Sequence, residues 1–234
     1  MNKDYFLPGT NRQLNILLEN IEVKDLSVLV IGEGSEGISK NIFSQGASKV
    51  IMLVQDEDSL LRARMNLASS KGISVKMMEY ANTDFKDSSF DLVFAQASIS
   101  SPNRNKIIKE IRRILKPAGY FCAGEIVKLT ESPPQFVKDI WSNSNILPLL
   151  SVELGKYYIE KNFEVILSTD ISYTLKDFYQ LSNNLLKEKS NDLSAEEKSH
   201  NKKLLKQISH ESNVYLKLGG NIHIGFKVLI LKKV

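Results

Sequence analysis

Short apolar runs alternate with amphipathic segments along much of the chain. Runs of this length, without polar alternation, are typical of strands that are buried on both faces of a parallel sheet. The pattern predicts strands over residues 26–31, 50–54, 75–78, 90–95, 120–127, 163–167 and 222–231. The first of these runs, LSVLVI, leads directly into a cluster of glycines.

Segments whose apolar residues follow helical spacing lie between these runs. The pattern predicts helices over residues 59–68, 105–115 and 151–161. Pro117 and Gly119 follow the second of these helices and are expected to end it. This alternation of strand and helix predicts an α/β fold with a doubly wound sheet and right-handed crossovers.

The second half of the chain is less regular. The proline pair at 133–134 stands where a helix could start. Ser194 and Glu197 form a capping-box pattern ahead of a charged helix that reaches about His210. The polar stretch 187–206 is either a surface helix or a mobile lid, and we favour the surface helix because most charge runs are simply solvated.

Composition places the chain among ordinary globular proteins. Its 234 residues are 42% hydrophobic and 25% charged, which argues for one domain with appendages and against disorder. No apolar run approaches the length of about 18 residues that a transmembrane helix needs. Residues 1–19 lack the apolar core of a signal peptide, so we expect none. The single cysteine, Cys122, excludes a disulfide framework and a thiolate zinc cluster, and we expect a cytoplasmic protein.

The net charge of +4 is a weak basic excess. Most of the basic residues are lysines, whereas arginine is the usual fork for phosphate and guanine. We therefore interpret the excess as a solvated lysine-rich surface and do not expect a nucleic-acid partner.

The most informative segment is the glycine loop after the first predicted strand. Gly32, Gly34 and Gly37 form a G-x-G-x-x-G pattern, which permits a tight turn and a close approach of the backbone to a ligand. Alone the pattern is weak, because it fits a dinucleotide, an adenosyl cofactor or a turn without a ligand. Glu33 and Glu36 within the loop would repel a pyrophosphate. The loop therefore favours S-adenosylmethionine, a sulfonium without phosphate, over a nicotinamide dinucleotide.

At this point the sequence resembles the class I S-adenosylmethionine-dependent methyltransferases, of the type that acts on small molecules. The resemblance runs from about Tyr5 to Asp177, with a fitting end from Tyr215. It rests on the segments VLVIGEGSEGIS, IMLVQDEDSLLRARMNLA, YANTDFKDSSFDLVFAQ and KIIKEIRRILKPAGYF. The last segment is the most specific, because it combines a helix, a Lys-Pro turn and a strand at the family's distance.

The resemblance implies a Rossmann-like sheet of seven strands in the order 3-2-1-4-5-7-6, with the last strand antiparallel and a helical insert or lid. We expect one domain over 1–234, in which 1–25 covers the cofactor, 26–127 binds it and 128–234 faces the acceptor. Within the first part, Pro8 and Gly9 should bend the segment 5–10 over the cofactor cleft.

The resemblance also implies which residues bind S-adenosylmethionine. Loop glycines pass under its methionine part, polar residues after the second strand meet its ribose, and an acid after the third strand meets its adenine. An aromatic side chain can cover the adenine face, and residues that follow the fourth strand line the methyl-transfer pocket. The implied cofactor-binding residues are Gly32, Glu33, Gly34, Gln55, Asp56, Glu79, Tyr80, Ala95 and Gln96.

Three positions depart from the family's pattern. Val30 replaces an acid at the end of the first strand, and Glu36 replaces a small loop residue. Gln55 stands where the family keeps the acid that binds the ribose hydroxyls, with Asp56 next to it. These departures motivate an alternative, a non-catalytic methyltransferase-like binding or scaffold protein with a degenerate cofactor site. A nicotinamide-dependent oxidoreductase is a third, weaker hypothesis.

Catalytic residues cannot be assigned from a motif, because methyl transfer needs proximity and alignment more than an acid–base pair. The weak candidates for a base are His210 and Tyr173, whereas His223 and Cys122 fit a structural role more simply. The sequence offers no metal site. By elimination the partner is a small-molecule methyl acceptor, with no membrane partner, and the oligomeric state is left open between monomer and homodimer.

Overall fold

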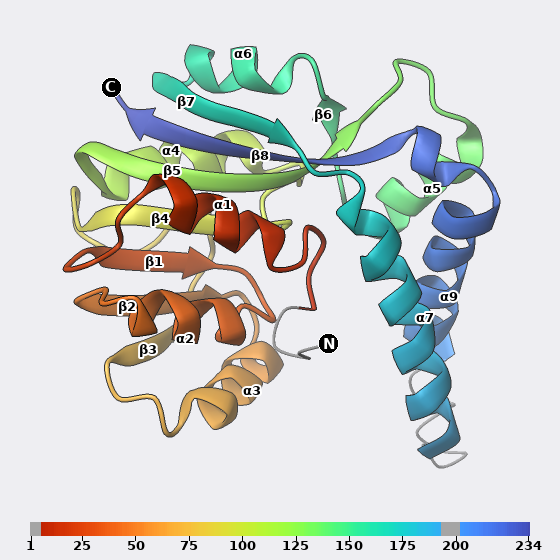
Figure 1. Cartoon of the computed structure of the whole chain (residues 1–234), viewed down its shortest axis with the longest axis horizontal. Coiled ribbons are helices and arrows are strands. Elements are labelled where there is room, and N and C mark those ends of the chain that lie inside the picture. Colours follow the sequence, from red (N-terminus) through yellow and green to blue (C-terminus); the bar gives the residue numbers. More distant parts are fainter. Residues whose placement is uncertain (1–5, 193–201) are drawn as a thin grey trace.

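The computed structural model describes residues 6–192 and 202–234, and a single mixed sheet forms its centre (Figure 1). The strand order is β3-β2-β1-β4-β5-β8-β7, and the two-residue β6 pairs with β5 beside this path. The strands are β1 (Ser27–Ile31), β2 (Lys49–Val54), β3 (Ile73–Met77), β4 (Phe90–Gln96), β5 (Leu115–Lys128), β6 (Leu149–Leu150), β7 (Phe163–Asp170) and β8 (Ile224–Lys233).

Strand directions confirm the predicted doubly wound topology. β1 pairs in parallel with β2 and β4, and β4 pairs in parallel with β5. β8 runs antiparallel between β5 and β7. With the short β6 set aside, the order is the predicted 3-2-1-4-5-7-6, and the last strand is antiparallel as expected.

Helices cover both faces of this sheet (Figure 1). One face packs against α1, α2, α3 and α5, and the other against α4 and α6. The helices are α1 (Arg12–Asn20), α2 (Glu36–Ser44), α3 (Glu57–Leu67), α4 (Arg104–Ile114), α5 (Gln135–Asn143), α6 (Leu154–Glu160), α7 (Thr174–Asp192) and α9 (Lys202–Lys217). Because both faces are covered, the central strands are continuously apolar, and Val28, Leu29 and Val30 of β1 are fully buried.

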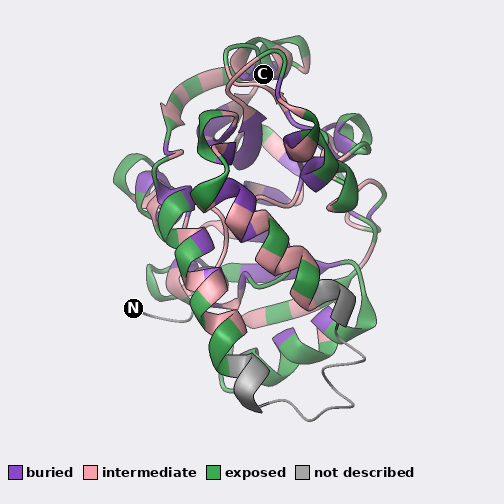
Figure 2. Cartoon of the chain, turned by 90° about the vertical axis from the view of Figure 1, so that its right-hand side faces the viewer, coloured by how far each residue is buried: buried purple, intermediate pink, exposed green. Residues whose placement is uncertain are grey.

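The helices α7 and α9 lie side by side at one end of the sheet (Figure 1). Figure 2 views the molecule from this end and shows buried, half-buried and exposed residues alternating along both helices, as amphipathic helices require. The rings of Tyr179 on α7 and Tyr215 on α9 stack with their centroids 4.5 Å apart. Both tyrosines also belong to the buried cluster that includes α1 and α2, so the helix pair packs against the core of the domain.

Several element boundaries differ from the prediction. The helix expected over 105–115 ends at Ile114, and β5 begins at once, so that Pro117 lies within the strand. Ala118 follows with a left-handed backbone, φ 59°, and the register between β4 and β5 shifts between Phe90 and Leu92. The sharp bend that the proline signals is therefore absorbed as an irregularity of the strand.

The C-terminal part shows further differences. The start of the last strand moves from residue 222 to Ile224, because Gly220–Ile222 forms a 3₁₀ turn. The predicted capping residues Ser194 and Glu197 lie outside the described residues, and α9 continues past His210 to Lys217. In the part of the chain that the structure describes, no helix is both long and apolar enough to cross a membrane.

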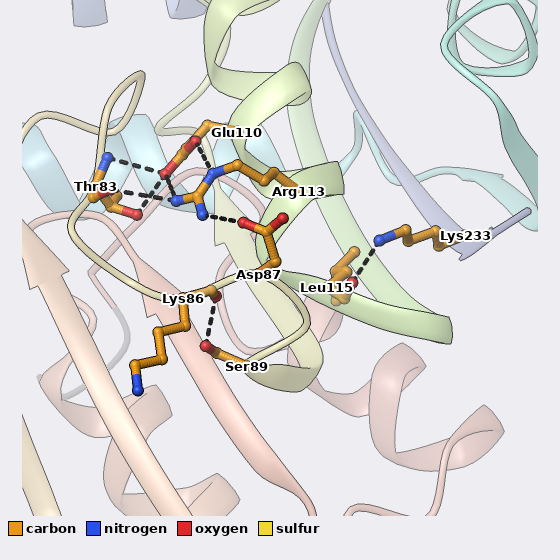
Figure 3. Close-up of polar contacts among 8 residues, drawn as sticks. All are labelled: Thr83, Lys86, Asp87, Ser89, Glu110, Arg113, Leu115 and Lys233. Atoms are coloured by element: carbon orange, nitrogen blue, oxygen red, sulfur yellow. Dashed lines mark hydrogen bonds and ion pairs between the residues drawn. The ribbon is translucent and has the colours of Figure 1, made fainter.

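A polar network ties the loop after β3 to helix α4 (Figure 3). Glu110 accepts hydrogen bonds from the backbone N–H of Thr83 at 2.9 Å and from Arg113 Nε at 2.8 Å. Arg113 also donates to Asp87 at 2.6 Å. Burial opposes ionisation of Glu110, but Arg113 and Thr83 together hold its pKa below the ordinary value. This network fixes the loop that begins just after Glu79 and Tyr80.

Candidate functional site

The glycine loop crosses from β1 to α2 at the carboxyl ends of the parallel strands, where α/β sheets bind ligands. Gly32 has φ +129° and Gly34 has φ +72°, backbone conformations that side chains rarely adopt. A Cβ on Gly32 would lie 3.0 Å from Cβ of Ser98, whose hydroxyl donates to the carbonyl of Ile31 at 2.9 Å. A Cβ on Gly34 would meet only Leu7, at 3.6 Å. Gly32 therefore permits close packing, while Gly34 leaves space above the loop.

A cavity of about 340 Å³ opens beside this loop. This volume lies within the usual range for small-molecule sites, about 300–1,000 Å³. Its floor comes from the ends of β1, β2 and β4, and its walls from the N-terminal segment, from the region after α5, and from α7 and α9. The described lining residues are Leu7, Pro8, Glu33, Gln55, Tyr80, Gln96, Ala97, Ser98, Ile126, Ser144, Ile146, Phe178, Tyr179 and Glu211.

Two carboxylates meet at the end of β2. Asp56 caps α3 by accepting a hydrogen bond from the backbone N–H of Ser59 at 2.8 Å, which lowers the pKa of Asp56. Burial raises the pKa of Glu33, and a hydrogen bond with Asp56 raises it further. The last residue of β2, Val54, is fully buried and has no polar side-chain atom. Glu33 therefore brings a second carboxylate, from the glycine loop, to the end of β2 where Asp56 lies.

Gln96, the last residue of β4, faces the cavity and is only 1% exposed. Its side-chain amide donates to the carbonyl oxygens of Pro8 at 2.7 Å and Thr10 at 2.8 Å. Its Oε1 is buried without a protein partner. A buried amide oxygen without a donor is costly, so a ligand that donates a hydrogen bond would satisfy it.

Of the nine residues predicted to bind cofactor, four line this cavity: Glu33, Gln55, Tyr80 and Gln96. The other five, Gly32, Gly34, Asp56, Glu79 and Ala95, lie next to lining residues in the chain and do not line the cavity themselves. Ala95 is fully buried, and its carbonyl accepts from Gln13 at 2.9 Å. Glu79 is exposed and forms an isolated bridge with Asn82.

The two candidate bases do not line the cavity. His210 is exposed on α9, and Tyr173 is 66% exposed. Tyr173 lines a different cavity, together with Lys176 and Tyr215. Neither side chain therefore lies beside the glycine loop. Helix α9 reaches the cavity through Glu211 instead.

Sequence reasoning missed the walls of the cavity that come from the second half of the chain. Ser144 follows α5, Phe178 and Tyr179 lie on α7, and Glu211 lies on α9, one residue beyond His210. No motif marks these residues, because they belong to separate helices that meet only in the fold. The N-terminal segment was predicted to cover the cofactor cleft. Its residues Leu7 and Pro8 line the cavity, whereas Tyr5 lies outside the described residues.

The cavity's chemistry fits S-adenosylmethionine better than a phosphate-bearing cofactor. Its described lining includes two carboxylates, Glu33 and Glu211, and no Lys, Arg or His. A ligand with positive charge and hydrogen-bond donors would use these groups and Oε1 of Gln96. A pyrophosphate would find two negative charges and, among the described lining side chains, no counterion. No group of His, Cys, Asp and Glu in the described residues could hold a metal ion.

Comparison with known proteins agrees with this chemistry. Residues 29–123 match the family model described as "Methyltransferase domain". A sterol 24-C-methyltransferase of Gibberella zeae is 33% identical over 62% of this chain and 38% of its own length. The chain thus spans well under half the length of such curated relatives.

Solved structures share the fold. Phosphoethanolamine N-methyltransferase 2 of Haemonchus contortus, in complex with S-adenosyl-L-methionine, has a TM-score of 0.79 at 16% identity, covering 95% of this chain and 52% of its own. The 4+2 cyclase SpnF has a TM-score of 0.78, also at 16% identity, with 95% and 80% covered. Residues 29–123 are thus similar to a methyltransferase domain, and the chain shares its fold with these solved structures.

Proposed function

We propose that this protein binds S-adenosylmethionine in the cavity beside the glycine loop and transfers its methyl group to a small molecule. The observation that carries the proposal is the meeting of Glu33, Gln55, Tyr80 and Gln96 around one cavity at the carboxyl end of the sheet. When bound, the cofactor supplies an electrophilic methyl group on a positively charged sulfur.

The chain's residues then bind and orient the cofactor. Gly34 leaves the loop open to the methionine part, and Oε1 of Gln96 can accept a hydrogen bond from its ammonium group. Glu33 and Gln55 stand where the ribose hydroxyls need acceptors, because Val54 at the end of β2 cannot provide one. We propose that the carboxylate of Glu33, from the glycine loop, binds the ribose hydroxyls in place of the family's acid after the second strand.

We propose that the segment after β3 binds the adenine. Tyr80 is 4% exposed and lines the cavity, and Glu79 precedes it at the surface. Burial raises the pKa of Tyr80 far above its ordinary value, and the nearby carboxylates of Glu33 and Asp56 add to this effect. The phenol therefore stays neutral, and its ring can cover an adenine face while Glu79 accepts from the amino group.

The N-terminal segment excludes water from the same cavity. Leu7 and Pro8 form part of its wall, and Gln96 fixes the carbonyl oxygens of Pro8 and Thr10. In the single domain that we propose for 1–234, residues 1–25 thus serve as the cover. Positioning and exclusion of water account for catalysis by in-line displacement, so no catalytic base is assigned to His210 or Tyr173.

Titration calorimetry tests this function directly. S-Adenosylmethionine and S-adenosylhomocysteine should each bind the purified protein with one site, and acceptor-dependent release of S-adenosylhomocysteine should follow with the correct small molecule. Absence of binding of both compounds at millimolar concentration would overturn the proposal.

A non-catalytic binding protein is the second candidate function. Val30, fully buried in β1, Gln55 after β2 and Glu36 at the start of α2 depart from the family's pattern and favour this alternative. The cyclase that shares the fold shows that the architecture alone does not dictate methyl transfer. Binding of S-adenosylhomocysteine without methylation of any acceptor in a broad panel would support the alternative.

Location and partners complete the proposal. Cys122 is fully buried, and burial raises the pKa of its thiol to about 12, so it is inert. We propose a cytoplasmic protein whose partner is a small molecule, with no nucleic acid. Fluorescence microscopy of a fusion protein tests this location, and a signal found outside the cytoplasm would contradict it.

A further inference from the structure

Glu211, on α9, lines the cavity with only one of its carboxylate oxygens in use. Its Oε1 accepts hydrogen bonds from the hydroxyl of Ser144 at 2.5 Å and from the amide of Gln207 at 3.1 Å. The same amide donates to the hydroxyl of Ser144 at 3.0 Å, which closes the network. Oε2 makes no hydrogen bond or ion pair with a described residue. The carboxylate is thus oriented by its neighbours and keeps one oxygen for a ligand.

Aromatic side chains from α7 share this wall of the cavity. Phe178 and Tyr179 both line it, with ring centroids 5.1 Å apart in an edge-to-face arrangement. Tyr179 is held in place by its stack on Tyr215, and Phe178 by its contact with Phe6 at 5.3 Å. Aromatic faces attract cations, and proteins use such rings to recognise quaternary ammonium ligands. A carboxylate beside such rings therefore forms a site for a nitrogen cation.

The other residues that line the cavity also favour a positively charged ligand. Glu211 and Glu33 are the only charged side chains among the described residues around the cavity. Glu33 is committed to the end of β2, where it bonds Asp56. Glu211 stands instead among residues that follow α5 or lie on α7 and α9, outside the stretch 29–123 that matches the methyltransferase domain. Its role is therefore not set by that match.

Resting on the proposed function, we propose that the methyl acceptor is a small molecule that carries an ammonium group and that Glu211 binds this group beside Phe178 and Tyr179. An acceptor whose recognised end is a carboxylate or phosphate is excluded from this wall by charge. A neutral acceptor would offer no counter-charge to the carboxylate of Glu211.

A pair of probes with the same shape and different charge tests the site. Choline and its carbon isostere 3,3-dimethylbutan-1-ol are titrated into the free protein and followed by NMR chemical shifts. Choline should bind at least tenfold more tightly than the isostere. In Glu211→Gln this preference should disappear through weaker choline binding, while the affinity for the isostere stays within twofold.

Asp177→Asn is the matched control, because it removes a negative charge from α7 next to Phe178 at an exposed position outside the cavity lining. It should change choline binding less than twofold. If Glu211→Gln fails to fold, Ser144→Ala serves instead, since it removes one of the two hydrogen bonds that orient the carboxylate and should weaken choline binding about threefold. Equal binding of the two probes by the wild type, or unchanged choline binding in a folded Glu211→Gln protein, overturns the inference.

Cofactor titrations of the same proteins separate this inference from the proposed function. If the wild type fails to bind S-adenosylhomocysteine, the proposed function is wrong. Tighter binding of choline than of its isostere would still establish the cation site. If Glu211→Gln weakens binding of S-adenosylmethionine relative to S-adenosylhomocysteine and leaves choline unaffected, the carboxylate serves the sulfonium. That result would overturn the ammonium site and leave the proposed function standing.

Discussion

The side-chain amide of Gln96 donates to the carbonyl oxygen of Pro8 at 2.7 Å, and so joins the end of β4 to the N-terminal segment. The same nitrogen donates to Thr10 at 2.8 Å, which uses both hydrogens of the amide. The remaining oxygen, Oε1, is buried without a partner at the cavity. One side chain therefore holds the cover in place and offers an acceptor to a ligand.

Replacing Gln96 by alanine should release this cover. Two net hydrogen bonds are lost, which predicts a decrease of about 1–3 kcal/mol in the free energy of unfolding. Affinity for S-adenosylhomocysteine should fall about tenfold, or about 1.4 kcal/mol, by calorimetry. Gln135→Ala, at an exposed position on α5, is the control and should change stability by less than about 0.5 kcal/mol. Wild-type affinity in a folded Gln96→Ala protein would show that the amide does not serve the cofactor.

Gly34→Ala should separate ligand contact from backbone strain. The residue has φ +72°, so a side chain costs about 1 kcal/mol or more of stability. The added methyl group would meet only Leu7 in the protein, at 3.6 Å, and otherwise projects into open space. Cofactor affinity should therefore fall at least about tenfold if the methionine part lies there.

Gly155→Ala is the reference for this experiment. Gly155 lies in α6 with no atom within 4 Å of an added Cβ. Alanine there should be neutral or stabilise by up to about 1 kcal/mol and leave cofactor affinity unchanged. A Gly34→Ala protein that binds S-adenosylhomocysteine like the wild type would mean that the loop is only a structural turn.

Gln55 offers the sharpest comparison at the ribose. Gln55→Ala should weaken cofactor binding by about 0.5–1.5 kcal/mol, the net value of a neutral hydrogen bond. Gln55→Asp should tighten binding, because a carboxylate makes stronger, charge-assisted bonds to hydroxyl groups. Titration of both variants with S-adenosylhomocysteine measures the difference. Weaker binding by Gln55→Asp would instead show that Glu33 and Asp56 already supply all the negative charge that this end of β2 tolerates.

Glu33→Gln should stabilise the free protein in a pH-dependent way. Burial and Asp56 raise the pKa of Glu33 above its ordinary value of 4.5, so ionisation of this group disfavours the folded state. Below about pH 4.5 the carboxyl group is protonated in both states, and the two proteins should melt alike. As pH rises through the raised pKa, the wild type should lose stability relative to Glu33→Gln.

Thermal melts between pH 4 and 8 measure the difference in melting temperature between the two proteins. Glu33→Gln should melt about 1–3 °C above the wild type once the pH exceeds the raised pKa, and the difference should then stay constant. S-Adenosylhomocysteine should bind the variant more weakly, because the amide lacks the charge that we assign to the ribose. A wild-type protein that is more stable than Glu33→Gln at neutral pH would contradict the direction of the pKa shift.

The strands and the glycine loop could be predicted from the sequence alone. Residues 28–31 and 92–95 are apolar without interruption because the strands are buried on both faces, and this property is local in the chain. Gly32 and Gly34 were identified for a similar reason, since their positive φ angles demand glycine whatever surrounds them. The order of the strands came from a resemblance to a known family, and the structure confirms it.

Only the tertiary structure decided what each polar side chain of the cavity does. Gln96 was predicted to contact the cofactor, and its bonds to Pro8 and Thr10 join residues more than 80 positions apart. Glu211 carries no local signal, because the hydrogen bond that orients it comes from Ser144, 67 positions away. His210, its neighbour in sequence, is exposed instead, because one helical position turns a side chain by about 100°. Sequence patterns determine which face of an element is apolar, whereas the pairing of polar groups across elements exists only once those elements have packed.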